Sequence, residues 1–175
     1  NGGRICTDAI DNSGGVDCSD HEVNMKILLN QAVAMGDLTD KQRNIMLEEM
    51  TDDVAALVLK NNYRQTQAIS IASVGAITRL EEYRRLMNTM ESEGKLNRSL
   101  EFLPDDETLS ERKLDKKGLT RPELSVLISY VKGDLKQTLI DSSLPDEPLL
   151  AGEMYKVFPQ ALTRKFSKEL GEHQL

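Results

Sequence analysis

The chain has 175 residues, 39% of them apolar and 4% aromatic, and its 22 basic and 29 acidic side chains leave a net charge of −7. This length suffices for a substantial core in one domain, or in one domain and part of another. The longest unbroken apolar run, residues 54–59, is far shorter than the roughly 18 residues of a membrane span. Because the charge is acidic without a basic stripe, nucleic acid is not an expected partner. Few aromatic and β-branched runs disfavour an all-β fold, so a mainly α-helical protein is expected.

The first twenty residues differ from the rest because they are rich in glycine, asparagine and aspartate. Such residues favour loops, so a glycine-rich loop is predicted here, with a short buried strand at residues 4–7. We interpret Cys6 and Cys18 as free thiols of a reducing, cytoplasmic compartment, the alternative being a disulfide that closes a small loop. Since the chain begins with Asn1 rather than Met, we expect a processed product or a piece excised from a longer protein.

Helix signals follow in regular order after this loop. Ser19 or Asp20 is predicted to cap a helix that Gly36 ends. A capping box at residues 39–42 opens the next helix, and residues 51–53 cap the apolar stretch behind it. The sequence therefore predicts three helices before its most periodic segment.

The segment 69–90 has the clearest helical period. Its apolar and small residues step alternately by four and by three, which predicts one stripe of a long helix, as in a helical hairpin or a coiled-coil seam. The stripe consists of Ile69, Ser73, Ala76, Leu80, Tyr83, Met87 and Met90. We expect it to face a core.

Residues 91–118 are polar and predict a linker that carries a short helix. Thr120 and Glu123 form a second capping box, with proline in the tolerated first turn. Two prolines then mark a turn, and a last helix is predicted to begin near Pro159. The apolar faces of these two helices are Leu124, Leu127, Val131, Leu135 and Leu139, and Leu162, Phe166 and Leu170.

Few residues have the spacing of a metal or catalytic site. His21 lies among Asp17, Cys18, Asp20 and Glu22, whose types suit a metal, but neighbours this close at a helix start point in different directions. Helix capping and first-turn electrostatics are the simpler explanation. No dinucleotide-binding glycine motif, phosphate loop or C-x-x-C pair occurs. We therefore predict no metal site and no catalytic triad, and a helical ligand-binding protein would depend only on His21 and its acidic neighbours.

The stretch 12–19 is the most informative part of the sequence. Paired glycines let the main chain approach a ligand closely. A helix that starts directly after them would offer free N–H groups and the positive end of its dipole to a carboxylate, and Ser19 would add a hydroxyl to the same anion. The competing interpretation is a tight loop that Ser19 merely caps.

Three segments of the chain, residues 3–24, 118–127 and 143–146, closely resemble the very large bacterial NAD-dependent glutamate dehydrogenases. The matching stretches read GRI, TDAIDNS, GVDCSDHEVN, GLTRPELSVL and SLPD. They are spread over nearly the whole chain, which is more specific than any single motif. The resemblance implies a C-terminal fragment of a cytoplasmic, homo-oligomeric oxidoreductase that converts L-glutamate to 2-oxoglutarate and ammonia with NAD.

The first segment also resembles the small hexameric amino-acid dehydrogenases, which carry Asn, a small residue, Gly-Gly-Val, then Ser and Glu in the same order. This resemblance implies that Asn12, with Gly14 near it, lies beside the nicotinamide end of the cofactor. It also implies that Val16 and Ser19, with Gly15 near them, line the glutamate pocket. The Ser19 hydroxyl would contact the side-chain carboxylate of the substrate. The catalytic lysine and aspartate and the dinucleotide-binding turn of the family have no match in this sequence, so no catalytic residue is assigned here.

We therefore expect residues 1–36 to be the tail of a catalytic module, and residues 37–175 to be an all-α domain with a structural or regulatory role. The chain by itself is expected to be inactive and to supply one wall of the substrate site. The alternative is a stand-alone helical interaction or oligomerisation module, which the stripe in 69–90 supports. A long upstream reading frame with a dinucleotide-binding motif would favour the first interpretation, and an initiator Met just before Asn1 the second.

Overall fold

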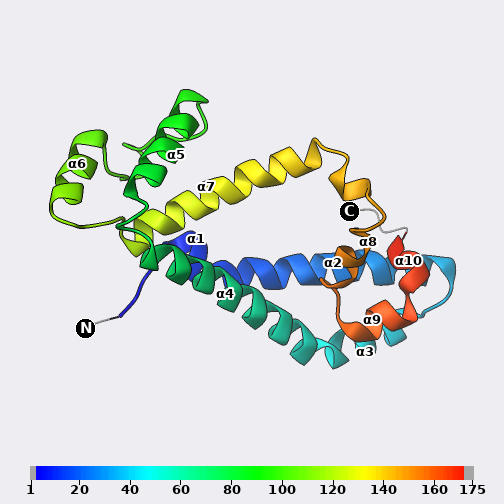
Figure 1. The fold of residues 1–175 in the computed structure, drawn as a ribbon. Coiled ribbons are helices and arrows are strands. Elements are labelled where there is room, and N and C mark those ends of the chain that lie inside the picture. Colours follow the sequence, from blue (N-terminus) through cyan, green and yellow to red (C-terminus); the bar gives the residue numbers. More distant parts are fainter. Residues whose placement is uncertain (1–2, 172–175) are drawn as a thin grey trace. The chain divides into compact units, whose positions relative to one another are not determined.

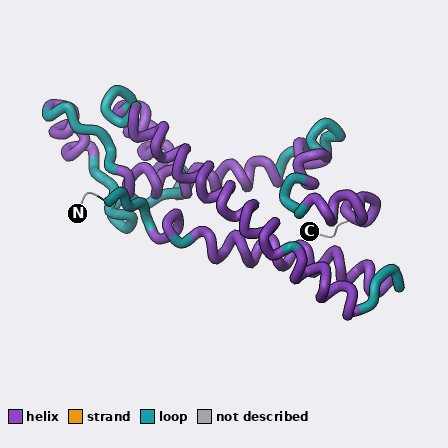
Figure 2. The backbone as a smooth tube through the Cα atoms, turned by 90° about the horizontal axis from the view of Figure 1, so that it is seen from below, coloured by secondary structure: helices purple, strands orange, loops and turns teal. Residues whose placement is uncertain are grey.

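The computed structural model describes residues 3–171, in which ten α-helices and one 3-10 helix follow one another (Figure 1). Figure 2 shows the described chain as helices joined by loops, without a strand. This confirms the mainly α-helical fold. Residues 3–7 have no regular secondary structure here; because a strand needs a neighbouring strand for its hydrogen bonds, the strand at 4–7 stays a prediction. Over the same described residues, no helix is long and apolar enough to cross a membrane.

The chain divides into two compact units, and it passes through each of them twice. The first unit is Asn1–Asp11 with Tyr63–Asp141, and the second is Asn12–Asn62 with Ser142–Leu175. This division by packing does not coincide with the division by function expected after residue 36, which stays a prediction.

The second unit begins with two helices whose ends are defined by local sequence. Its helices are α2 (Ser13–Met35), α3 (Asp40–Glu49), the start of α4 (Thr51–Val74), the 3-10 helix η1 (Leu144–Asp146), α8 (Ala151–Tyr155), α9 (Gln160–Lys165) and α10 (Ser167–Gly171). Gly36 ends α2 in the left-handed conformation, with φ of 85°, which glycine adopts without steric cost. Thr39 and Gln42 close both hydrogen bonds of the predicted capping box. Both helix ends are therefore confirmed.

The core of the second unit combines α2 with the helices near the C-terminus. Its buried members are Met25, Leu28, Leu29, Ala32, Leu38, Met50, Phe158, Leu162, Phe166 and Leu170. The predicted last helix is present as two short ones, because Phe166 interrupts it between α9 and α10. The three apolar residues expected on its face are all buried.

The start of α2 differs from the expectation. The helix begins at Ser13, not at Ser19 or Asp20, so Gly14 and Gly15 lie in its first turn rather than in a loop. Glycine is weak in a helix interior but is tolerated in a first turn that packing supports. A Cβ at Gly14 would lie 3.7 Å from Asn62 Nδ2 and 3.9 Å from Val58 Cγ1 of α4. The prediction of a glycine-rich loop capped by Ser19 is wrong, because the small residue lets α2 and α4 pack closely.

The first unit contains α1 (Asp8–Asp11), the remainder of α4, α5 (Leu80–Ser92), α6 (Asp106–Leu114) and α7 (Arg121–Ile140). The segment 69–90 is not one long helix, since α4 ends at Val74 and a turn over residues 75–79 precedes α5. Gly75 and the β-branched residues around it are weak helix formers. Five of the seven predicted stripe residues are nevertheless buried, so the stripe faces a core although the helix is broken.

The main core of the first unit lies between α5, α6 and the start of α7. Its buried members are Ala76, Leu80, Met87, Met90, Leu96, Leu103, Leu109, Leu119, Leu124 and Leu127. Beyond this point the apolar stripe of α7 is exposed: Val131 is 38%, Leu135 53% and Leu139 38% exposed. Among the described residues, only the first half of the predicted α7 face is therefore buried. Both cysteines are free thiols, as predicted. Cys6 is buried and Cys18 is exposed.

A bidentate ion pair fastens α6 to the first turn of α7. Arg112 Nη1 and Nη2 each lie 2.8 Å from a carboxylate oxygen of Glu123, which also closes the predicted capping box with Thr120. Burial of Glu123 favours its neutral form, but the hydrogen bonds from Arg112 and Thr120 together outweigh burial and lower the pKa of its carboxyl group. The hydrogen bond from Arg98 likewise lowers the pKa of Asp106.

These shifts predict that acid destabilises the first unit. Because the folded chain binds protons to Glu123 and Asp106 less readily than the unfolded chain, their contribution is complete above pH ~4.3 and is lost as pH falls through the lowered pKa values. Glu123→Gln should cost about 1–3 kcal/mol at pH 7 and flatten this pH dependence. Urea unfolding between pH 7 and pH 3 measures both effects. An identical pH slope in Glu123→Gln and in the exposed control Glu111→Gln would contradict the assignment.

Candidate functional site

Four of the five predicted site residues lie on one face of α2. The four residues follow one another at intervals of three, one and three, and a helix with 3.6 residues per turn places such residues in one stripe. They are Asn12, Gly15, Val16 and Ser19. All four are exposed, and the Val16 side chain is 65% exposed. Val23 continues the stripe one turn further and is 52% exposed. This α2 face, residues 12, 15, 16, 19 and 23, thus presents polar and apolar groups together.

The opposite face of α2 is occupied by α4. Ser13 Oγ donates to Asn62 Oδ1 at 2.6 Å, and Asn61 Nδ2 donates to Asp17 at 3.0 Å and 3.3 Å. Gly14, the fifth predicted residue, lies on this packed side against α4. The structure therefore separates Gly14 from the other four residues and directs the α2 face away from the packing within the unit.

Two hydrogen-bonding features characterise the α2 face. The side chain of Asn12 occupies the N-cap position but makes no capping hydrogen bond, so the first N–H groups of α2 are not closed by that cap. Ser19 lies within the second turn, and its hydroxyl donates to the Gly15 carbonyl at 3.3 Å. The positive end of the α2 dipole is therefore at residues 13–16, about two turns before the start at Ser19 or Asp20 expected from the sequence.

His21 is buried on the packed side of α2 and is 6% exposed. Its Nδ1 lies 2.9 Å from the Val157 carbonyl oxygen, and its Nε2 lies 3.7 Å from Asp17 Oδ1. Cys18 is exposed and lies on another side of the helix. In the described part of the chain, no group of three or more His, Cys, Asp or Glu side chains is placed to hold a metal ion.

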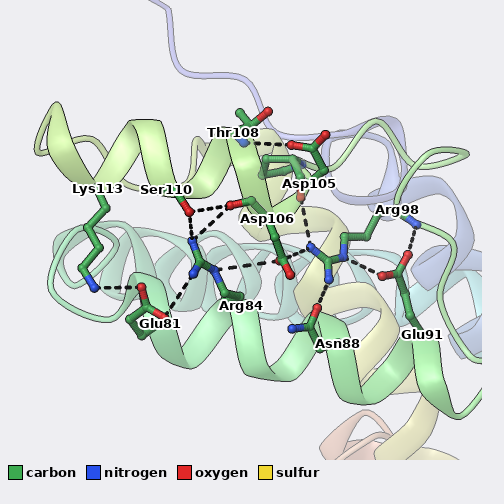
Figure 3. A network of polar contacts seen from close by, with 11 residues as sticks. Glu81, Arg84, Asn88, Glu91, Arg98, Asp105, Asp106, Thr108, Ser110 and Lys113 are labelled. Carbon is green, nitrogen blue, oxygen red and sulfur yellow. Dashed lines mark hydrogen bonds and ion pairs between the residues drawn. The ribbon is translucent and has the colours of Figure 1, made fainter.

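A second polar cluster surrounds the buried guanidinium of Arg98 in the first unit (Figure 3). Arg98 Nε lies 2.7 Å from Glu91 Oε2, and Nη1 lies 2.9 Å from Asp106 Oδ1. Arg98 Nη2 donates to Asn88, and Nη1 reaches the Pro104 carbonyl at 3.4 Å. The guanidinium is thus held by two carboxylates, and it fastens the loop between α5 and α6 to both helices.

A cavity of about 560 Å³ adjoins this cluster and is lined by Arg98, Ser99, Leu103 and Thr108 among others. Because the Arg98 guanidinium already binds two carboxylates, it is not available to an anionic ligand. Arg84 extends the cluster towards Ser110, whose hydroxyl it contacts at 3.0 Å (Figure 3). The cluster is therefore structural. No sequence motif indicated Arg98, since its partners come from separate turns and a loop.

Two family models match the chain. The catalytic domain of bacterial NAD-glutamate dehydrogenase matches residues 1–72, and the C-terminal region of glutamate dehydrogenase matches residues 116–175. The first match contains the α2 face and runs past residue 36. The second contains α7 and the helices near the C-terminus.

Curated relatives match the chain from end to end. The NAD-specific glutamate dehydrogenases of Pseudomonas aeruginosa, Halomonas elongata and Mycobacterium tuberculosis are 58%, 51% and 41% identical to it over 174 residues. These residues are 99% of this chain but 11% of each relative's length. The chain therefore corresponds to a small part of each of these relatives.

Proposed function

Because this chain belongs to the bacterial NAD-glutamate dehydrogenase family, as its sequence predicted, we propose that the whole protein oxidises L-glutamate to 2-oxoglutarate and ammonia with NAD. The α2 face is the part of this chain that forms one wall of the substrate site. The observation that carries this proposal is the exposure of Asn12, Gly15, Val16 and Ser19 on one stripe of α2. These residues lie within the region that matches the catalytic domain.

The chemistry of the α2 face suits an amino-acid dicarboxylate. Val16 offers an apolar wall to the methylene groups of glutamate, and the Ser19 hydroxyl turns from its local bond to donate to a carboxylate oxygen. The positive end of the α2 dipole favours negative charge near residues 13–16, about one turn before Ser19. The uncapped amide of Asn12 fits the carboxamide of a nicotinamide, which supports a role for this residue towards NAD.

The remaining steps require residues outside the matched α2 face. Oxidative deamination needs a base that deprotonates the substrate amine and a site that holds the dinucleotide. NAD supplies the hydride acceptor when bound. Since the chain has no match to the catalytic lysine and aspartate of the family, we infer that it binds and orients substrate and does not by itself turn it over.

Ser19→Ala in the full-length protein tests this proposal. Loss of one hydrogen bond to a charged group costs about 1.5–3 kcal/mol, so kcat/KM for glutamate should fall roughly tenfold to hundredfold. Initial rates of NADH formation against glutamate concentration measure it. Cys18→Ser is the matched control, because Cys18 is adjacent and exposed but lies off the α2 face. Equal kcat/KM values for Ser19→Ala and the unaltered protein would refute a substrate role for Ser19.

Self-association of the whole protein is the second part of this proposal. It is supported by the exposed apolar residues Val131, Leu135 and Leu139 in the second half of α7. An interaction module without catalytic function would need the same surface. Light scattering on the whole protein measures self-association, and an assay of NADH formation from glutamate distinguishes the dehydrogenase from an interaction module without catalytic function.

A further inference from the structure

The protonation of His21 is constrained from one side by the main chain. His21 Nδ1 lies 2.9 Å from the carbonyl oxygen of Val157. A carbonyl oxygen accepts hydrogen bonds and cannot donate them, so Nδ1 carries a proton in either charge state of the ring. This contact joins α2 to Val157, which lies just after α8 and 136 residues after His21 in the sequence.

The other ring nitrogen faces a carboxylate. His21 Nε2 is buried without a hydrogen-bond partner among the described residues, and Asp17 Oδ1 lies 3.7 Å away. Asp17 itself is held by the side-chain amide of Asn61 on α4. In the neutral ring, the lone pair of Nε2 would face the negative carboxylate. The Val157 carbonyl and the Asp17 carboxylate therefore lie at the two nitrogens of one ring.

We propose that His21 is a positioning residue for glutamate oxidation, its ring bridging the Asp17 carboxylate and the Val157 carbonyl. The proposal rests on the proposed function of the α2 face. The bridge fixes the rotation of α2 from its packed side, and Ser13 and Asp17 add contacts to α4 on that side. Because consecutive helical residues are about 100° apart, a small rotation of α2 would move Val16 and Ser19 off the substrate.

The bridge connects both matched regions of the family. His21 and Asn61 lie in the region that matches the catalytic domain, and Val157 lies in the region that matches the C-terminal part. Each of the three residues is in the second compact unit. The imidazole therefore adds a polar contact to the apolar core that joins α2 to the C-terminal helices.

The protonation is tested on this chain by ¹⁵N NMR of the histidine ring. Nδ1 of the His21 ring should carry a proton, because it faces the Val157 carbonyl oxygen. His21→Asn identifies the resonances by their loss. A neutral ring that carries its proton on Nε2 would overturn the bridge, because Nδ1 could not then donate to Val157. This arm does not depend on any enzymatic activity.

The positioning role is tested in the full-length protein. His21→Ala should raise KM for glutamate on the order of tenfold with a much smaller change in kcat, and His21→Asn, whose amide keeps a donor for Val157, should recover part of the loss. Lys26→Gln, an exposed change on the same helix, is the control.

The outcomes of the kinetic experiment are separable. Full-length protein that forms no NADH from glutamate contradicts the proposed function, and the NMR result then stands alone. An active protein in which His21→Ala leaves KM unchanged overturns the positioning role.

Discussion

Gly118→Ala is expected to destabilise the first compact unit by about 3 kcal/mol, the upper range for overpacking. A Cβ at this position would lie 2.5 Å from the carbonyl carbon of Ala76 and 2.7 Å from its oxygen and from the nitrogen of Ile77. These are backbone atoms of the turn between α4 and α5, so no side-chain rotation can relieve the overlap. Urea unfolding followed by circular dichroism at 222 nm measures the loss.

Gly133→Ala is the matched control, since a Cβ there meets nothing within 4 Å. Gly133 lies inside α7, where alanine favours the helix by up to about 1 kcal/mol. The two substitutions therefore have opposite expected signs. If Gly118→Ala unfolds at the same urea concentration as Gly133→Ala, the close approach of residues 118 and 76 is wrong.

The close approach of Gly118 to Ala76 holds the segment before α7 against the turn between α4 and α5, and local sequence does not indicate this contact. From sequence, Gly118 is one glycine of a polar linker before a capping box. In the structure it allows the chain before α7 to touch the turn at Ala76, with Leu119 buried directly after it. Backbone contact between residues 42 positions apart leaves no periodic signal, which is why the break between α4 and α5 was not predicted.

Helix ends and core faces were predictable because they depend on neighbours in sequence. The capping boxes at Thr39 and Thr120 form as expected, since each needs only a hydroxyl and an acceptor three residues apart. The stripe in 69–90 likewise identifies buried residues across a helix break. The start of α2 was not predictable, because it depends on the packing of Gly14 against Val58 and Asn62 of another helix.

The candidate site was predictable in part. The resemblance to dehydrogenases selected Asn12, Gly15, Val16 and Ser19, and helical geometry places them on one exposed face. Gly14 was grouped with them by adjacency in sequence, but adjacent helical residues point about 100° apart. The contact of His21 with Val157 depends on packing over 136 positions, so sequence could indicate the histidine and not its partner.

Leu28→Ala is expected to destabilise the second compact unit by about 2–5 kcal/mol, the range for a fully buried leucine. Leu28 has no exposed surface and lies in the cluster that joins α2 to Leu162, Phe166 and Leu170. Truncation removes apolar contacts and leaves a cavity that the surrounding helices fill only partly. Thermal unfolding of the purified variant measures the effect as a lower Tm.

Val23→Ala is the matched control on the same helix, because Val23 lies on the α2 face and not in this core. Val23 is 52% exposed and points away from the cluster, so its truncation should change stability by less than about 0.5 kcal/mol. A helix face that contributes little to folding yet retains apolar residues is available for a ligand or for another part of the protein. If Val23→Ala destabilised the chain as much as Leu28→Ala, the α2 face would be a packing surface of this unit, and its assignment to the substrate wall would fail.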